Sequence, residues 1–289
     1  MAKVLITGAS GGFGKLTVEA LIKKNHQVAA SMRGIKDKNK KIADELSKLG
    51  AKIIEMDVTQ DNSVNAGVEQ SIKVLGGLDV VVNNAGVGVL GVQETFTPDD
   101  WQKLFNVNVF GVQRVNRAVL PHMRSKKSGL ILHVSSLLGR IAIPFYGPYN
   151  SSKWALEAMC ENYRVELSGF GVDVGIIEPG GYPTTFINNL LLPSDKTRES
   201  TLGELQKQAE GFLKGFEQAL AGNPAQNPQN VADAIVKVIE TPAGRREFRT
   251  IVDKMGMADA VQPYNEHLDK VMSGIYTAFG MAQMRQLKV

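Results

Sequence analysis

The sequence predicts an α/β fold in which helices cover both faces of a doubly wound parallel sheet within a single domain. Two observations lead to this prediction. Short apolar runs alternate with longer segments of helical periodicity along the first 180 residues. The runs are apolar at consecutive positions, as in strands that are buried on both faces. Helical connections with right-handed crossovers then give a doubly wound sheet.

Six strands are expected, and each is a short apolar run. The first, Val4-Leu5-Ile6, is closed by Gly8. The helices are recognised by apolar residues three or four positions apart, as at Ile42, Leu46 and Leu49. The predicted strands are residues 4–6, 28–30, 53–54, 78–82, 130–134 and 172–177, and the predicted helices are residues 15–24, 38–49, 63–75, 101–123, 149–167 and 231–239.

The single predicted domain has three segments. Residues 1–180 hold the sheet, and ligands of such sheets bind at the carboxyl ends of the strands. Residues 181–225 contain short helical stretches between prolines, which indicates a mobile segment that covers a ligand. Residues 226–289 are expected to form a helical C-terminal extension.

The composition excludes several classes of protein. Charged residues make up 21% and hydrophobic residues 43% of the chain, so it is not disordered. The net charge of +4 is too small to indicate nucleic-acid binding. The single cysteine, Cys160, forbids an internal disulfide and fits a reducing, cytoplasmic compartment. No apolar run reaches the roughly 18 residues of a membrane helix, and the first run is too short for a signal peptide.

A glycine-rich turn joins the first strand to the first helix. Its sequence is Thr7-Gly8-Ala9-Ser10-Gly11-Gly12-Phe13-Gly14. Such glycines permit a tight turn and let backbone N–H groups approach a pyrophosphate at the positive end of the helix. The alternative is an ordinary glycine-rich connection, but the position between a buried strand and a helix favours a dinucleotide site.

The end of the second strand bears on which dinucleotide would bind. A site for NAD carries an acidic residue there, which bonds the ribose 2′-hydroxyl. This chain has Ser31-Met32-Arg33 and no carboxylate before Asp37. The planar guanidinium of Arg33 can pair with a 2′-phosphate, so the sequence predicts NADP(H). The lysines that follow are interpreted mainly as a solvated helix face: Lys36, Lys38, Lys40 and Lys41.

Polar residues also follow the third and fourth strands. Asn84, Ala85 and Gly86 lie just after the fourth strand, where small residues let a nucleotide lie against the backbone. Turns favour Asn and Gly as well, so this segment has a purely structural alternative. Asp57 ends the third strand, where it either bonds an adenine amino group or only starts a turn.

A serine, a tyrosine and a lysine have the spacing of an acid–base site. Ser136 follows the fifth strand, and Tyr149 and Lys153 lie four positions apart on one face of the next helix. A free tyrosine has a pKa near 10 and is a poor base at neutral pH. A lysine ammonium about 4 Å away contributes roughly 4 kcal/mol at an effective dielectric near 20, before the losses from desolvation, and this would lower the pKa of Tyr149 toward neutrality. The alternative is a surface helix pair.

Together these motifs resemble the short-chain dehydrogenase/reductase family, which has the Rossmann fold. The resemblance covers about residues 1–190 in order and spacing. It adds Asn108-Val109-Phe110-Gly111, the pair Asp57-Val58, and Pro179-Gly180 with Thr184 to the motifs above. Residues 227–249 are similar to members with longer C-termini, including hydroxysteroid- and retinol-dehydrogenase-like reductases.

The resemblance implies a role for each residue. Tyr149 would be the acid–base group, Lys153 would lower its pKa and bond the nicotinamide ribose, and Ser136 would hold the substrate oxygen. Asn108 would anchor a water that links Lys153 to solvent. No metal is expected. The implied cofactor-binding residues are Gly8, Ser10, Gly11, Gly12, Phe13, Gly14, Arg33, Asp57, Val58, Asn84, Ala85, Gly86, Tyr149, Lys153, Pro179, Gly180 and Thr184.

The expected activity is that of an NADP(H)-dependent carbonyl reductase or alcohol dehydrogenase acting on a small molecule. Two alternatives stay open: a non-catalytic NADP-binding protein, and a nucleotide-sugar epimerase or dehydratase that uses the same Tyr-Lys chemistry. Family members differ in substrate at residues 137–148, so the substrate is not implied. The resemblance does imply a homodimer or homotetramer. The predicted helices 101–123 and 149–167 carry apolar residues over a wide arc, including Val107, Phe110, Trp154 and Met159, and those that do not cover the sheet are expected to meet another subunit.

Two residues with chemical potential are interpreted as packing residues. His133 lies within the fifth strand, and no second metal ligand stands at a useful spacing from it. Cys160 lies on the same helix as Tyr149 and is expected to be a small buried hydrophobe.

Overall fold

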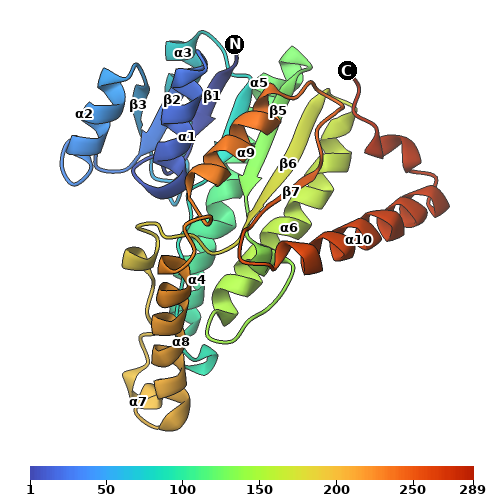
Figure 1. The fold of residues 1–289 in the computed structure, drawn as a ribbon. Helices are drawn as coiled ribbons and strands as arrows, with labels where there is room; N and C mark the ends of the chain where they lie inside the picture. The colour runs from blue at the N-terminus through green and yellow to red at the C-terminus, as the bar shows by residue number, and fades with distance from the viewer.

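The computed structural model describes all 289 residues, which are built around one seven-stranded sheet. The strand order is β3-β2-β1-β4-β5-β6-β7, and every neighbouring pair is parallel. The chain winds from β1 to one edge and then to the other, so the predicted doubly wound sheet is confirmed (Figure 1). The strands are β1 Lys3–Ile6, β2 Gln27–Met32, β3 Lys52–Glu55, β4 Val80–Asn83, β5 Gly129–Val134, β6 Val172–Pro179 and β7 Arg249–Val252.

The strand register explains why the apolar runs do not alternate with polar residues. Leu5 of β1 pairs with Ala29 of β2 and with Val81 of β4, and all three face one layer of helices. The next residue of β1, Ile6, faces the opposite layer. Because both faces are covered, Leu5 and Ile6 are both fully buried.

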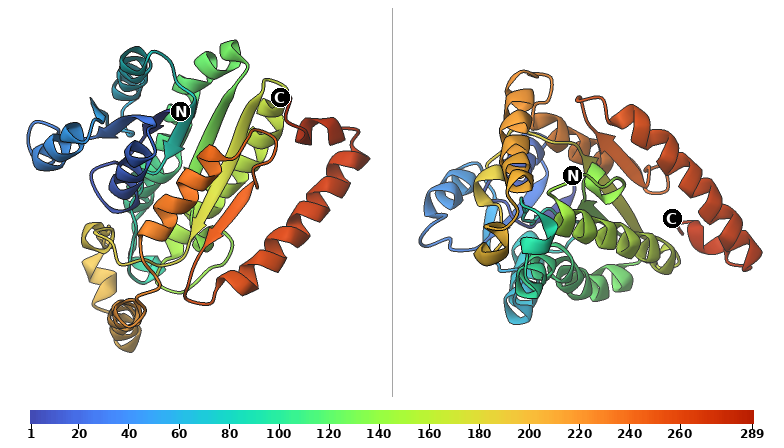
Figure 2. Two further views of the ribbon diagram at one scale, coloured as in Figure 1. Left: turned by 45° about the horizontal axis from the view of Figure 1, so that its top comes forward. Right: turned by 90° about the horizontal axis from the view of Figure 1, so that it is seen from below.

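Two layers of helices cover the sheet (Figure 2). One layer contains α1, α2 and α9, and the other contains α3, α5 and α6. No helix combines the length and the apolar character that crossing a membrane requires. The helices are α1 Gly12–Lys23, α2 Lys40–Lys48, α3 Asp61–Leu75, α4 Pro98–Asn108, α5 Phe110–Lys126, α6 Gly147–Ser168, α7 Lys196–Glu199, α8 Glu204–Ala221, α9 Gln229–Glu240 and α10 Ala258–Ala278, with short 3₁₀ turns η1 Gln93–Thr95, η2 Leu137–Gly139, η3 Ile187–Asn189 and η4 Ala282–Arg285.

The helix predicted over residues 101–123 is two helices in the structure, so that prediction is wrong. α4 begins after Thr97, whose side chain accepts from the Asp100 N–H. Between α4 and α5, Val109 has φ −120° and ψ −62°, which is not helical. The buried Asn108 side chain accepts a hydrogen bond from the Val87 N–H and donates one to the Val87 oxygen, both at 2.9 Å. Apolar periodicity continues across the break and so does not reveal it.

The C-terminal segment is not wholly helical, which corrects the expectation for residues 226–289. β7 pairs with β6 and completes the sheet, and α9 packs into one of its helical layers. The sequence Arg-Thr-Ile-Val of β7 is short and half polar because β7 is an edge strand, so it lacks the apolar signal of the other strands. Within residues 226–289, only α10 and η4 follow the last strand and extend away from the sheet (Figure 1).

Candidate active site

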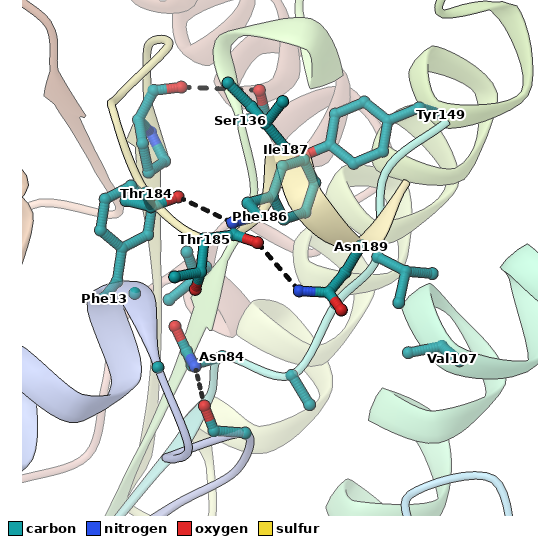
Figure 3. A pocket seen from close by; sticks show the side chains of 18 of the residues that line it. Phe13, Asn84, Val107, Ser136, Tyr149, Thr184, Thr185, Phe186, Ile187 and Asn189 are labelled. Carbon is teal, nitrogen blue, oxygen red and sulfur yellow. Dashed lines mark hydrogen bonds between the residues drawn. The ribbon is translucent and has the colours of Figure 1, made fainter. Parts of the chain in front are cut away.

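A cavity of about 620 Å³ lies at the carboxyl ends of the strands. Residues that follow β1 to β6 form one side of it, and residues 184–190 with part of α8 close the other side (Figure 3). This is the place where doubly wound sheets bind ligands. Of the residues singled out in the sequence as catalytic or cofactor-binding, all but Gly14 and Asn108 line this cavity.

The glycine turn is closed by contacts that no larger residue would permit. Gly8 has φ +68°, and a Cβ on it would lie 2.8 Å from Ala85 Cα. A Cβ on Gly14 would lie 2.4 Å from the Gly8 oxygen, so Gly14 shapes the turn without facing the cavity. Asn84 Nδ2 donates to the Thr7 and Gly8 oxygens at 3.0 and 3.1 Å, which ties the loop after β4 to the turn. The start of α1, at Gly12, is thereby left open to the cavity.

Charged side chains gather at the end of the cavity next to β2 and β3. Arg33 Nη1 lies 3.6 Å from Asp57 Oδ2. Asp57 Oδ1 also accepts from the N–H and the hydroxyl of Thr59, at 2.9 and 2.8 Å, so Asp57 both starts a turn and lines the cavity. Burial raises the pKa of Asp57, but the Thr59 bonds and Arg33 outweigh it and hold that pKa below its usual range. Asp57 is therefore an anion beside Arg33.

One of the four lysines interpreted as a solvated face belongs to this end of the cavity. Lys38 lines it, together with Asn39, whose side chain donates to the Arg33 oxygen at 2.6 Å. Lys40 instead pairs with Asp44 on the exposed face of α2 at 2.6 Å. Lysine spacing alone does not separate these two positions, because the loop after β2 decides which lysine turns inward.

Ser136, Tyr149 and Lys153 come together at the opposite end. Ser136 follows β5, where its hydroxyl accepts from the Leu138 N–H at 3.1 Å and donates to the Pro179 oxygen at 3.5 Å. Tyr149 and Lys153 are one turn apart on α6, and Lys153 Nζ donates to the Val134 oxygen at 2.9 Å. Figure 3 shows the Tyr149 hydroxyl directed toward the Ser136 side of the cavity. One serine and one phenol thus reach the same enclosed space.

Burial acts against the expected lowering of the pKa of Tyr149 by Lys153. Burial raises the pKa of Tyr149 above its ordinary value, and the Ser136 hydroxyl only partly opposes this. Burial also lowers the pKa of Lys153 to about 8, against the opposing charge of Glu157. Lys153 Nζ lies 5.6 Å from the centre of the Tyr149 ring. Burial is the loss that the attraction between the charged forms has to overcome, and in the structure burial is the larger effect on Tyr149.

Asn108 lies behind the cavity wall. Its amide bonds Val87 through both atoms and donates to Ser152 Oγ at 3.1 Å. It therefore fixes the loop after β4 and the break between α4 and α5. The implied water-anchoring role stays a prediction.

Aromatic side chains that the sequence analysis did not single out form the rest of the wall. They come from the segment before α6 and from residues 181–225, the two regions that the motifs left unassigned. Phe212 and Phe216 lie four positions apart on α8, so helical spacing could have indicated that they share a face. Tyr146, Tyr182 and Phe186 lie outside regular elements, where no periodic pattern marks which residues turn inward. The aromatic lining residues not previously named are Tyr146, Tyr182, Phe186, Phe212 and Phe216.

The two residues interpreted as packing residues are buried. His133 is fully buried and lies 3.2 Å from Asn116 Nδ2, and burial lowers its pKa to about 4, so it is neutral. Cys160 is also fully buried, and burial raises the pKa of its thiol well above the usual value. Neither residue lines the cavity.

Comparison with known proteins shows the family. Residues 2–193 match the family model for short chain dehydrogenases. The chain therefore belongs to the short-chain dehydrogenase/reductase family of oxidoreductases, as the motifs indicated.

Several relatives extend this match beyond the family model. The chain is 33% identical to a 3-ketodihydrosphingosine reductase of Bacteroides thetaiotaomicron, over 82% of each chain. It is 34% identical to human retinol dehydrogenase 8, over 84% of this chain and 80% of that protein. Among solved structures, a short-chain dehydrogenase from Streptomyces avermitilis has a TM-score of 0.74, with 27% identity over 97% of each chain. The last match includes the C-terminal segment that the family model omits.

Proposed function

We propose that this protein is an NADP(H)-dependent oxidoreductase that interconverts a ketone or aldehyde and the corresponding alcohol by hydride transfer. One observation carries the proposal. Ser136, Tyr149 and Lys153 line the same cavity as the glycine turn and Arg33. A cofactor held at the turn and a carbonyl group held at Tyr149 would therefore share one enclosed space.

The residues at the turn fit a dinucleotide phosphate. Cβ atoms at Gly8 and Gly14 would clash with the backbone, so only glycine permits the close packing of this turn. Because α1 begins at the cavity, its N-terminal N–H groups can face a phosphate bound there. Met32 stands at the position of the carboxylate that would bond a ribose 2′-hydroxyl, and Arg33 and Lys38 supply positive charge beside it. When bound, NADPH supplies the hydride.

Each polar side chain at the other end has a task in reduction. The Tyr149 hydroxyl gives its proton to the carbonyl oxygen, and the raised pKa of buried Tyr149 keeps that proton in place until then. The Ser136 hydroxyl donates to the same oxygen. Lys153 stays mostly protonated at neutral pH, because its pKa is about 8, and its charge stabilises the tyrosinate that forms.

The walls around Tyr149 favour a substrate with an uncharged apolar body. The Tyr149 ring lies 5.9 Å from Phe186, and Tyr146 lies 5.9 Å from Phe212, measured between ring centres. The charged lining residues are Arg33, Lys38 and Asp57 at the far end and Lys153 beside Tyr149. A carboxylate or phosphate on the substrate would find no further cation on these walls, and burying an unpaired charge is costly.

The test is turnover with NADPH on matched ketones. We expect an aryl ketone to be reduced, and the same ketone with a ring carboxylate to have a kcat/KM at least tenfold lower. Phe212→Ala should reduce kcat/KM for the aryl ketone, whereas Lys207→Ala, at an exposed position on the same helix, should not. Equal rates for the charged and uncharged ketones would contradict the proposed substrate class.

Two other functions remain distinguishable by the same measurements. A protein that only binds NADP would show cofactor binding and no turnover across aldehydes, ketones, hydroxysteroids and retinoids. A nucleotide-sugar epimerase or dehydratase would retain bound NAD and act with no net oxidation. The uncharged aromatic wall at Tyr149 speaks against a nucleotide-sugar substrate, whose phosphates need cations or backbone donors.

A further inference from the structure

A buried ionic network lies behind the cavity. Arg249 of β7 contacts three carboxylates: its Nε lies 3.0 Å from Glu157 and 3.2 Å from Glu178, and its Nη2 lies 2.7 Å from Glu161. Glu157 is 2% exposed and Glu178 is fully buried. Buried ionisable groups of this kind are tolerated only with well-placed partners, so the contacts of Arg249 hold β6, β7 and α6 in fixed relative positions.

A single amide joins this network to the C-terminal helix. Asn265 of α10 donates from Nδ2 to Glu178 Oε2 at 2.7 Å and accepts at Oδ1 from Arg140 Nε at 2.8 Å. The Arg140 guanidinium also lies 4.8 Å from the centre of the Tyr264 ring. Asn265 and Val261 are the only buried residues of α10. Figure 1 shows that this end of α10 starts beside the carboxyl end of β7, and that the helix then runs outward.

Each partner of Asn265 is next to a group of the site. Arg140 ends the short turn η2 that begins directly after Ser136. Glu178 directly precedes Pro179 and Gly180, which line the cavity, and the Pro179 oxygen accepts from the Ser136 hydroxyl. Asn265 therefore connects the turn that follows Ser136 to the end of β6, which carries Pro179. Its amide is suited to this place because it donates to one loop and accepts from the other at the same time.

We propose that Asn265 is a positioning residue, through which α10 sets the orientation of Ser136 and of the Pro179 backbone. This inference rests on the proposed function, because its consequence is a rate of carbonyl reduction. A displacement of about 1 Å at a reacting group costs up to about a hundredfold in rate. The C-terminal extension thus influences the reaction through Asn265, although Asn265 itself does not line the cavity.

The experiment compares two changes on α10. Asn265→Ala removes both bonds to the active-site loops. Asp269→Ala removes the side-chain contacts of α10 to Arg164 and Arg285, and so loosens the same helix elsewhere. With saturating NADPH and an aryl ketone, we expect Asn265→Ala to lower kcat at least tenfold with a change in KM below threefold. We expect Asp269→Ala to keep kcat within twofold of wild type.

A double-variant cycle separates positioning from general loosening. Arg140→Met removes the same bond from the other side, so it should lower kcat to a similar degree. The double variant should be no more than about twofold slower than the slower single variant, because both changes break the bond between Arg140 and Asn265. If Asn265→Ala does not fold, Arg140→Met by itself decides between the outcomes.

Three results would overturn the inference: wild-type kcat in Asn265→Ala, losses that multiply in the double variant, or an equal loss in Asp269→Ala. In each of these cases the wild type still reduces the ketone, so the proposed function stands. Absence of turnover in the wild type would overturn the proposed function and this inference with it.

Discussion

At the scale of single residues, burial determines how Tyr149 and Lys153 behave. Burial raises the pKa of Tyr149 and lowers that of Lys153 to about 8, so at neutral pH Tyr149 keeps its proton and Lys153 is mostly protonated. A buried, protonated phenol suits the donation of a proton to a carbonyl oxygen. In the proposed reaction, the attraction of Lys153 would act on the charge that develops in the transition state, which is where it would accelerate the step.

The preference for NADP(H) is a prediction about Arg33 and Met32. We expect wild type to favour NADPH over NADH by tenfold to several hundredfold in kcat/KM, because charge-assisted bonds to a phosphate contribute about 1.5–3 kcal/mol each before screening. Arg33→Ala should raise the KM for NADPH with little effect on NADH. Met32→Asp should reverse the preference, since a carboxylate repels the 2′-phosphate and accepts from the 2′-hydroxyl.

A matched control separates a specific contact from general positive charge. Lys41→Ala removes an exposed lysine on α2 that does not line the cavity, and it should leave both cofactors unaffected. The cofactor assignment is contradicted if wild type favours NADH, or if Arg33→Ala affects both cofactors equally.

At the scale of elements, the sequence predicts strands buried on both faces well and irregular connections poorly. The apolar runs of β1, β4 and β5 are unmistakable because helices cover both sides of them. The edge strand β7 has no such run, and the break at Val109 depends on a tertiary bond between Asn108 and Val87. A similar division holds for the site: short motifs indicate the residues at strand ends, whereas the aromatic wall comes from irregular segments and from α8, where no motif marks the residues that face the cavity.

Two buried glutamates, Glu178 of β6 and Glu157 of α6, predict a pH dependence of the free energy of unfolding. Burial, with Glu157 nearby, raises the pKa of Glu178 from 4.5 to about 8. A carboxyl with a higher pKa in the folded state binds more protons when folded, so its contribution to stability falls as the pH rises between these two values. Glu178→Gln lacks this titration. We therefore expect the stability of Glu178→Gln relative to wild type to increase between pH 5 and pH 8.

Urea unfolding at several pH values measures this difference. The free energy of unfolding of each protein is compared at pH 5, 6.5 and 8, with the slope m checked for two-state behaviour. A difference that stays constant over this range, or that moves in the opposite direction, would show that Glu178 is ionised in the folded protein at neutral pH.

At the scale of the whole molecule, exposed apolar residues predict an assembly of subunits. Phe110, at the start of α5, is 51% exposed, and Trp154 of α6 is 42% exposed. Arg140 lies 5.8 Å from the Trp154 ring, and α10 reaches α6 through Arg164 and Asp269, so part of this surface is occupied within the chain. We therefore expect the contact between subunits to centre on Phe110, in a closed dimer or tetramer.

Light scattering at micromolar concentration tests this assembly. Phe110→Asp should give a smaller species than wild type, because a buried carboxylate at the contact is costly. Leu49→Asp, at an equally exposed residue near the opposite edge of the sheet, should not change the mass. A wild-type protein with the mass of a single chain would rule the assembly out.

The most direct measurement of the central claim follows a labelled hydride. Wild type and Tyr149→Phe are incubated with an aryl ketone and with NADPH that carries deuterium at the transferred C4 position, and the product is analysed by mass spectrometry. We expect wild type to place deuterium on the carbinol carbon. Tyr149→Phe should bind NADPH but form this product at least a hundredfold more slowly, because it has lost the proton donor. Binding without deuterium transfer in wild type, or an unchanged rate in Tyr149→Phe, would contradict the account.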